Sequence, residues 1–512
     1  MRRWTWIALL AVTLVLAWSG AGGAWVACWP AVVSLGVIVT TRHPAAGLAA
    51  GLVAGCLLIS GAHPGEALRT LFADHLFPSL LGPWHVGALV FTLLLGAFAG
   101  VLESSGGFET LLRRLLGRSG AGERVLGATY GIGLLCFFDG LANSLLLGRI
   151  ARPAADRAGV PREKLAWVVD STSSPVACVA FLSTWIATQL SLIGDSLPGS
   201  DPYLLYFQSI PANPYCLLTL AMIPAALFWR WNPGPMGRCR AAAPGVAAVD
   251  GGNPDCAVWR VLLPLAVLAG SIAVYFQLLS GEPVRFFSLE AWRVAASSSA
   301  GPAALVGGAV TGLLAALACH PQRAVARDSA LHGAAGLLPA LVILVLAWAL
   351  GSVFSAMGAG AAIQKALESA VPPEWLALTV FGSAAVISFA TGSSWGTMAL
   401  VMPLALGSAV AAGGFDPAWY PAVIGAVFGG AVFGDHASPF SDTTIVSAHA
   451  SGCDTTAHVW TQLPYALTAA AAAAGAYALM ALGIAPWVAT GSAGVVLLLV
   501  IRLLTLRQGK KG

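Results

Sequence analysis

Four aspartates stand inside otherwise apolar stretches of the sequence: Asp139, Asp170, Asp435 and Asp442. A carboxylate at the centre of a lone membrane helix costs about 2.5–3.5 kcal/mol on an insertion scale, which points to a function. The alternative is structural, because an Asp at a broken helix end accepts hydrogen bonds from backbone N–H groups. The sequence leaves both roles open for Asp170, and for the other three we favour ion binding.

Side chains with oxygen atoms cluster around these aspartates, and hard cations such as Na⁺ prefer oxygen ligands. Desolvation favours a protonated carboxyl group, whereas a nearby cation favours the ionised form. One site can therefore hold a proton or Na⁺ in turn. The residues that we expect to bind Na⁺ or the proton are Asp139, Asn143, Asp170, Ser173, Ser174, Thr391, Ser393, Ser394, Asp435, Ser438, Asp442 and Thr443.

Three histidines lie in or after the last polar stretch. His436 could titrate near neutral pH and sense pH, or it could be a hydrogen-bonding residue at a helix break. We expect His449 and His458 to lie at the membrane interface.

The composition indicates what positions these residues. Of the 512 residues, 58% are hydrophobic and 9% are charged, whereas soluble chains carry about 25% charged residues. Most of the surface must therefore face hydrocarbon. The net charge of +4 includes no internal basic run that would indicate nucleic acid, and the nine cysteines form no CxxC pair, which excludes the usual zinc and disulfide frameworks.

Apolar stretches long enough to cross a bilayer recur along the chain, since one crossing needs about 20 residues. Arg-rich segments should be cytoplasmic, and this rule predicts about twelve crossings with both termini in the cytoplasm. The single-crossing candidates are Trp4–Trp18, Ala24–Thr40, Ala45–Ser60, Trp84–Val101, Trp167–Leu190, Pro214–Trp229, Val261–Leu279, Pro302–Cys319, Gly333–Phe354, His458–Ala481 and Trp487–Leu504.

Two stretches do not fit a single crossing. Val125–Leu147 lies between the Arg-rich segments Arg113–Arg124 and Arg149–Lys164, so both of its ends should be cytoplasmic. A re-entrant hairpin satisfies both, with Gly131, Gly133 and Gly140 as the flexible backbone of its turn. Trp375–Ala412 is too long for one crossing and is interrupted at Thr391–Thr397, so we expect a hairpin that enters from the outside.

Each hairpin precedes a crossing interrupted by Asp, small hydroxyl residues and Pro: Val169–Trp185 and Phe433–His449. Opposed hairpins with broken helices indicate inverted repeats, a recurrent transporter design. The predicted fold is therefore all-α and polytopic. The expected division is 1–62, N-terminal transmembrane helices; 63–231, first repeat; 232–258, cytoplasmic linker; 259–483, second, inverted repeat; and 484–512, a last transmembrane helix with a basic cytoplasmic tail.

Four sequence blocks resemble the NhaC family of sodium/proton antiporters: GDHASPFSDTTIVSAH, TGSSWGTMALVMP, FFDGLANSLLLGRIARPAADR and PREKLAWVVDSTSSPVACVAFLSTWIA. The resemblance runs from about Trp84 to Tyr465 and implies membership of a superfamily of ion transporters with inverted repeats and re-entrant hairpins. Gly140 stands where the family commonly has a second acidic residue, and Ala437 where it commonly has Cys. The stoichiometry therefore stays open.

The sequence thus predicts a secondary active transporter that exchanges internal Na⁺ for external H⁺. The alternative is a sodium- or proton-coupled exchanger of a small carboxylate or amino acid. A membrane enzyme or a channel is less favoured, because no nucleophile with a base and no HExxH motif is present. The expected partners are Na⁺ and H⁺, with Li⁺ or a small organic solute as alternatives, and the lipid bilayer. We expect no cofactor.

The location follows from the same evidence. We expect a multi-pass protein of the bacterial cytoplasmic (inner) membrane, and the sequence leaves its oligomeric state open, a homodimer included. The basic and apolar N-terminus, Met1–Gly20, is interpreted as a first transmembrane helix, with a cleaved signal peptide as the alternative.

Overall fold

The computed structural model describes residues 2–20, 24–41, 43–116, 122–180, 183–241, 257–280, 301–359, 361–362, 365, 371–411, 416–439 and 441–508. All regular secondary structure in these ranges is helical. The predicted linker is described except for residues 242–256, which lie outside these ranges.

Eight helices in the described ranges are long and apolar enough to cross a membrane, or up to ten if each of two bent pairs is one span. Four further apolar helices are shorter. The predicted all-α polytopic membrane fold is confirmed, whereas the count of about twelve crossings stays a prediction. Outside the hairpins and broken helices, the main helices are α1 (Arg2–Ser19), α2 (Ala24–Thr41), α3 (Pro44–Ile59), α6 (Pro83–Ser104), α13 (Pro202–Ser209), α14 (Pro214–Phe228), α15 (Trp259–Leu279), α17 (Gly301–Cys319), α18 (Arg323–Gly336), α19 (Leu338–Ala356), α25 (Thr455–Ala481) and α26 (Pro486–Gln508).

Short elements complete the described chain. They connect the long helices or lie at their ends. They are α4 (Pro64–Arg69), the π-helix η1 (Thr70–Leu76), α5 (Phe77–Leu81), α7 (Gly107–Leu116) and the 3₁₀-helices η2 (Gly234–Arg238), η3 (Pro373–Trp375) and η4 (Pro417–Trp419).

Both predicted hairpins are pairs of helices in contact with each other. The first is α8 (Gly122–Leu135) with α9 (Gly140–Arg157), and the second is α21 (Leu376–Thr391) with α22 (Ser394–Ala411). In the second, Gly392 ends α21 with φ +68°, a left-handed conformation that glycine adopts without strain.

The predicted role of the glycines in the first hairpin is wrong. The turn lies at 136–139, whereas Gly131 and Gly133 lie inside α8. A Cβ on Gly133 would stand 2.6 Å from Thr172 Oγ1, so this glycine allows α8 to approach the broken helix closely. Gly140 begins α9 and has no positive φ.

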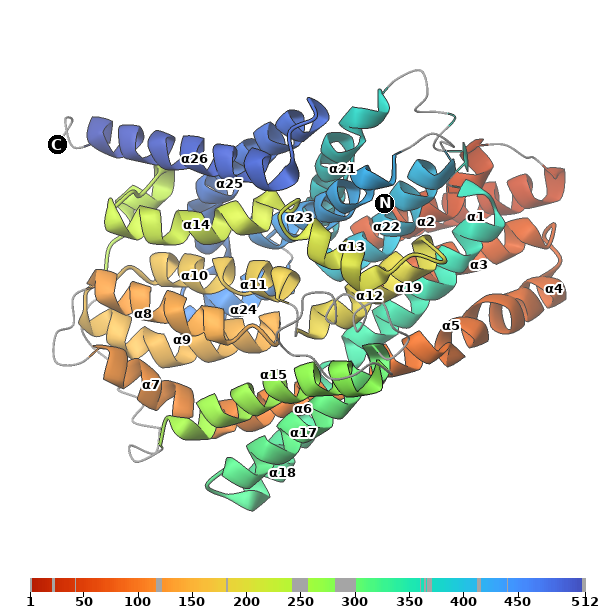
Figure 1. Ribbon diagram of the computed structural model, residues 1–512. Helices are drawn as coiled ribbons and strands as arrows, with labels where there is room; N and C mark the ends of the chain where they lie inside the picture. The colour runs from red at the N-terminus through yellow and green to blue at the C-terminus, as the bar shows by residue number, and fades with distance from the viewer. Residues whose placement is uncertain are drawn as a thin grey trace.

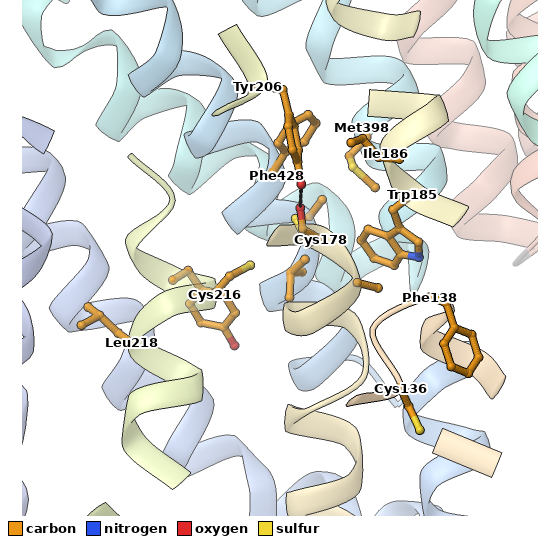
Figure 2. Close-up of a cluster of buried hydrophobic side chains, with 14 of the residues drawn as sticks. Cys136, Phe138, Cys178, Trp185, Ile186, Tyr206, Cys216, Leu218, Met398 and Phe428 are labelled. Carbon is orange, nitrogen blue, oxygen red and sulfur yellow. Dashed lines mark hydrogen bonds between the residues drawn. The ribbon is translucent and has the colours of Figure 1, made fainter. Parts of the chain in front are cut away.

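Both predicted broken helices are present. The first consists of α10 (Arg162–Ser171), α11 (Ser174–Val179) and α12 (Thr184–Ser196), and the second of α23 (Tyr420–Ala437) and α24 (Asp442–Ser451). Side chains satisfy the carbonyls exposed where α11 ends, as membrane-embedded backbone requires. Tyr206 Oη donates to Cys178 O over 3.2 Å, the dashed contact in Figure 2, and Ser183 Oγ donates to Ala177 O over 2.6 Å.

Elements of the two halves interleave around these breaks. The helix α24 packs against α9 and α10 of the first half, and α11 packs against α23 of the second. Figure 1 shows α24 beside α10 and α11, away from α21 and α22 of its own half. The helices α6, α15, α17 and α18 pack together along one side of the molecule (Figure 1). The interleaving brings the predicted site residues of both halves together.

Candidate functional site

A cavity of about 470 Å³ lies where the tips of both hairpins meet the break between α23 and α24. The first hairpin contributes Asp139–Leu141, the second Thr391–Trp395, and the second broken helix Asp435 and Ser441–Thr443. The remaining wall comes from the start of α3, the start of α19 and Trp185 of α12. The cavity therefore has polar hairpin tips on one side and apolar helices on the other.

The carboxylate of Asp435 joins both halves of the chain at this cavity. Its Oδ2 accepts hydrogen bonds from Ser174 Oγ over 2.7 Å and from Ser394 Oγ over 2.5 Å. Its Oδ1 accepts one from Ser441 Oγ over 3.2 Å. Asp435 is only 3% exposed, so its charge relies on these hydroxyls or on a bound cation. Four oxygen-bearing side chains therefore converge on one point.

Asp139 lies on the same cavity but also caps a helix. It precedes α9, and its Oδ1 accepts a hydrogen bond from Ala142 N over 2.7 Å. Its Oδ2 accepts one from Thr184 Oγ1 over 2.9 Å. Thr184 begins α12, so Asp139 also ties the first hairpin to the first broken helix. The structural role weighed for Asp139 is present beside its position on the cavity wall.

Asp170 forms a separate, fully buried cluster. Its Oδ2 accepts from Gln462 Nε2 over 2.6 Å and contacts His458 Nε2 at 3.3 Å. Thr444 and Ser447 of α24 each donate to it over 3.2 Å. The structure thus places Asp170 off the lining of the cavity, against α24 and α25 of the second half. The side chain of His458, which we expected at the membrane interface, is fully buried in this cluster.

The other predicted residues fall into two groups. Thr391, Ser393, Asp442 and Thr443 line the cavity, and Asp442 is exposed to it at the start of α24. Asn143, Ser173 and Ser438 do not line it, and neither does Ser174, which reaches Asp435 from behind the wall; all four are buried. Asn143 Nδ2 donates to the carbonyls of Gly133 and Thr172, so it ties the first hairpin to the break between α10 and α11.

His436 has the structural role that we weighed against pH sensing. It is buried, it does not line the cavity, and its Nδ1 lies 2.9 Å from Tyr215 Oη of α14. The backbone carbonyl of His436 accepts a hydrogen bond from Gln462 Nε2. These contacts fix the C-terminal end of α23, next to Asp435.

Sequence reasoning missed Thr184, Ser441, Thr444, Ser447, His458 and Gln462 as partners of the buried carboxylates. Ser441 and Thr444 stand in the block that carries Asp435, so a search for hydroxyls near each Asp could have found them. His458 and Gln462 are four residues apart on α25, where a helix presents both on one face. This spacing is the sequence feature that could have identified the two residues as partners of one buried carboxylate.

Comparisons with known proteins agree with this architecture. The Na⁺/H⁺ antiporter family matches residues 164–483, more than half of the chain. An uncharacterized protein of Haemophilus influenzae is 28% identical over 506 residues, which cover 92% of this chain and 94% of that protein.

Two relatives with named activities match a shorter part of the chain. The Na⁺/H⁺ antiporter NhaC of Alkalihalophilus pseudofirmus is 37% identical over 19% of this chain and 21% of its own length. The malate-2H⁺/Na⁺-lactate antiporter of Bacillus subtilis is 35% identical over 26% of this chain and 28% of its own length.

Among solved structures, the YdaH transporter of Alcanivorax borkumensis is similar in fold. It has a TM-score of 0.51 and 18% identity, and the match covers 81% of this chain and 88% of that one. The chain is therefore a multi-pass secondary transporter, and it belongs to the Na⁺/H⁺ antiporter family.

Proposed function

We propose that this transporter exchanges internal Na⁺ for external H⁺ and that Asp435 is the carboxylate that both ions use. The observation that carries the proposal is the convergence on Asp435 of hydroxyls from both halves, Ser174 from the first and Ser394 and Ser441 from the second. Asp139, Thr391, Ser393, Asp442 and Thr443 line the same cavity and supply further oxygen atoms.

The chemistry follows from the serine hydroxyls, because each can both donate and accept a hydrogen bond. Each carries one donor hydrogen and two acceptor lone pairs. In the described structure the hydrogens point to the carboxylate, and a rotation about the Cβ–Oγ bond would turn lone pairs toward an entering Na⁺. The carboxylate supplies the negative charge that balances either Na⁺ or a proton. Since both compete for one group, binding of one favours release of the other.

The proposed repeats, 63–231 and 259–483, explain why residues of both halves contribute to the sites of Asp170 and Asp435. Asp170 and Asp435 each lie on the helix before a break, and each accepts hydroxyl hydrogen bonds from the other half. A shift of one half relative to the other would change the ligands of both aspartates together. Such coupling suits a transporter that exposes one site to each side in turn.

One observation favours a second candidate, the exchange of a small carboxylate. A volume of about 470 Å³ is far larger than one cation requires and lies in the range of small-molecule sites, about 300–1,000 Å³. The relative in Bacillus subtilis is named for malate and lactate. The N-terminal end of α22 lines the cavity, and helix N-termini attract carboxylates.

The test is transport by the purified full chain in proteoliposomes, with a pH-sensitive dye inside. We expect addition of Na⁺ to move protons in the wild type and Asp435→Asn to abolish this movement. Asp416→Asn is the matched control, because Asp416 caps the short helix η4 on the surface and Asn also caps helices. Exchange that needs malate or lactate in addition to Na⁺ would favour the second candidate. Normal Na⁺-driven proton movement in Asp435→Asn would refute the proposed site.

A further inference from the structure

A second cavity, of about 490 Å³, lies at the opposite ends of three helices that also line the first cavity. On α19, residues 339–343 line the first cavity and residues 347–355 line the second. On α22, Trp395 lines the first, and Pro403 and Gly407 line the second. On α12, Trp185 lines the first, and residues 192–196 line the second.

Apolar side chains separate the two cavities. The rings of Trp185 and Trp395 meet at the end of the first cavity, with centroids 5.8 Å apart. Figure 2 shows Ile186 and Met398 grouped next to Trp185, between α12 and α22. Ile186, Met398 and Leu344 of α19 are each at most 1% exposed. A wall of this kind gives an ion no ligands, so it blocks passage in this conformation.

Among the described residues that line the second cavity, the one carboxylate is Asp195, which is paired with His85. His85 Nε2 lies 3.0 Å from Asp195 Oδ2, and the imidazole lies over the indole of Trp348 with ring centroids 4.1 Å apart. The Asp195 side chain is 45% exposed, whereas that of His85 is 13% exposed. A third cavity, of about 350 Å³, shares His85, Gly194 and Asp195 and extends the opening.

Unused polar atoms surround this pair. His85 Nδ1 and Trp348 Nε1 have no hydrogen-bond partner within the described part of the chain. Ser79, Ser196, Ser352 and Ser355 line the second cavity. Ser352 Oγ also contacts His75 Nδ1 at 2.9 Å. The cavity thus holds oxygen ligands and a half-exposed carboxylate.

We propose that this second cavity is the other mouth of the transport pathway and that Asp195 binds monovalent cations there. The first cavity is the mouth that leads to Asp435. The pathway between the two mouths would run along the contact between α12, α19 and α22. A carboxylate in a recess with low-dielectric walls raises the local concentration of cations. Removal of its charge therefore weakens cation capture from that side without altering the central site.

The first experiment rests on the proposed exchange of Na⁺. In proteoliposomes with the protein in one orientation, we expect Asp195→Asn to raise the KM for Na⁺ on one side about threefold or more. The kcat and the KM on the other side should stay unchanged. The matched control is Asp201→Asn, a surface cap. Unchanged KM values on both sides, or a loss confined to kcat, would refute the role of Asp195.

The second experiment needs no transport activity, so it separates this inference from the proposed function. Ser355→Cys places a thiol in the second cavity, where Ser355 is exposed. Gly336→Cys places one at the first cavity, where a Cβ meets no atom within 4 Å. A membrane-impermeant maleimide should label the two from opposite faces of the vesicle, above the labelling of the native chain. Labelling of both from the same face would refute a second mouth.

Discussion

Ser174 and Asp435 lie in opposite halves of the chain, yet the hydroxyl of Ser174 donates to the carboxylate of Asp435 over 2.7 Å. Ser174 begins α11, and Asp435 lies near the end of α23. In the reverse direction, Thr444 and Ser447 of α24 donate to Asp170 of α10. Hydroxyls next to each break therefore donate to the aspartate of the other break. A change in conformation at one break would thus alter the hydrogen bonds at the other.

The first prediction concerns the hydroxyls around Asp435. A hydrogen bond or ligand to a charged group contributes about 1.5–3 kcal/mol, so Ser174→Ala and Ser394→Ala should each raise the KM for Na⁺ by about tenfold or more. Ser408→Ala is the control, since Ser408 is buried on the same helix as Ser394 but donates its hydrogen bond to Ala405 O of its own helix and not to Asp435. An equal effect of the control would show that these serines act through packing alone.

The second prediction concerns the buried cluster of Asp170. His458→Leu or Gln462→Leu should lower the thermal stability of the protein in detergent, because removing a partner of a buried charge costs about 3–5 kcal/mol. Asp170→Asn, which keeps the shape and one acceptor oxygen, should lower it less than Asp170→Leu. A thermal unfolding assay on the four variants checks this order. Equal unfolding temperatures for Asp170→Leu and the wild type would contradict it.

The third prediction compares two glycines of the first hairpin. At Gly140 a Cβ would meet its nearest neighbour, Ser173 C, at 3.7 Å, which is ordinary contact. Gly140→Ala should therefore fold normally. Gly133→Ala should reduce stability, because its Cβ would overlap Thr172 Oγ1 and Thr172 Cβ at 2.6 and 2.8 Å. Thermal unfolding of the two purified variants measures the difference, and similar losses in both would refute this packing argument.

A fourth prediction tests whether Asp139 takes part in transport. Gly140→Asp adds a carboxylate on the wall of the same cavity, next to Asp139. Two like charges in a poorly solvated site do not ionise independently, so the pH profile of Na⁺-dependent proton movement should shift. Since the backbone at Gly140 tolerates a Cβ, the variant should reach the membrane in normal amounts. A folded variant with an unchanged pH profile would show that this hairpin tip is scaffold.

A fifth prediction concerns topology. Arg114 of α7 and Arg157 of α9 are both exposed and flank the first hairpin. If the hairpin is re-entrant, Arg114→Cys and Arg157→Cys should react with an impermeant maleimide from the same face of the membrane. Reaction from opposite faces would mean that the segment between them crosses the bilayer, and the predicted arrangement of the first repeat would be wrong.

The sequence by itself determined the class of the protein and the parts that carry its chemistry. Few charges and long apolar stretches indicated a polytopic membrane fold, because a soluble surface cannot be built from this composition. Polar interruptions marked both hairpin turns and both helix breaks. These features are local, since backbone groups in a membrane must be satisfied near the place where they are exposed.

Only the tertiary structure decided which of these parts meet. Nothing in the local sequence pairs Ser174 with Asp435, or Asp170 with His458, because residues 261 and 288 positions apart come together only when the halves interleave. The fold divided the predicted oxygen ligands between a cavity around Asp435 and a fully buried cluster around Asp170. That division depends on how α24 packs between α9 and α10, which side-chain volume and helix packing determine over the whole molecule.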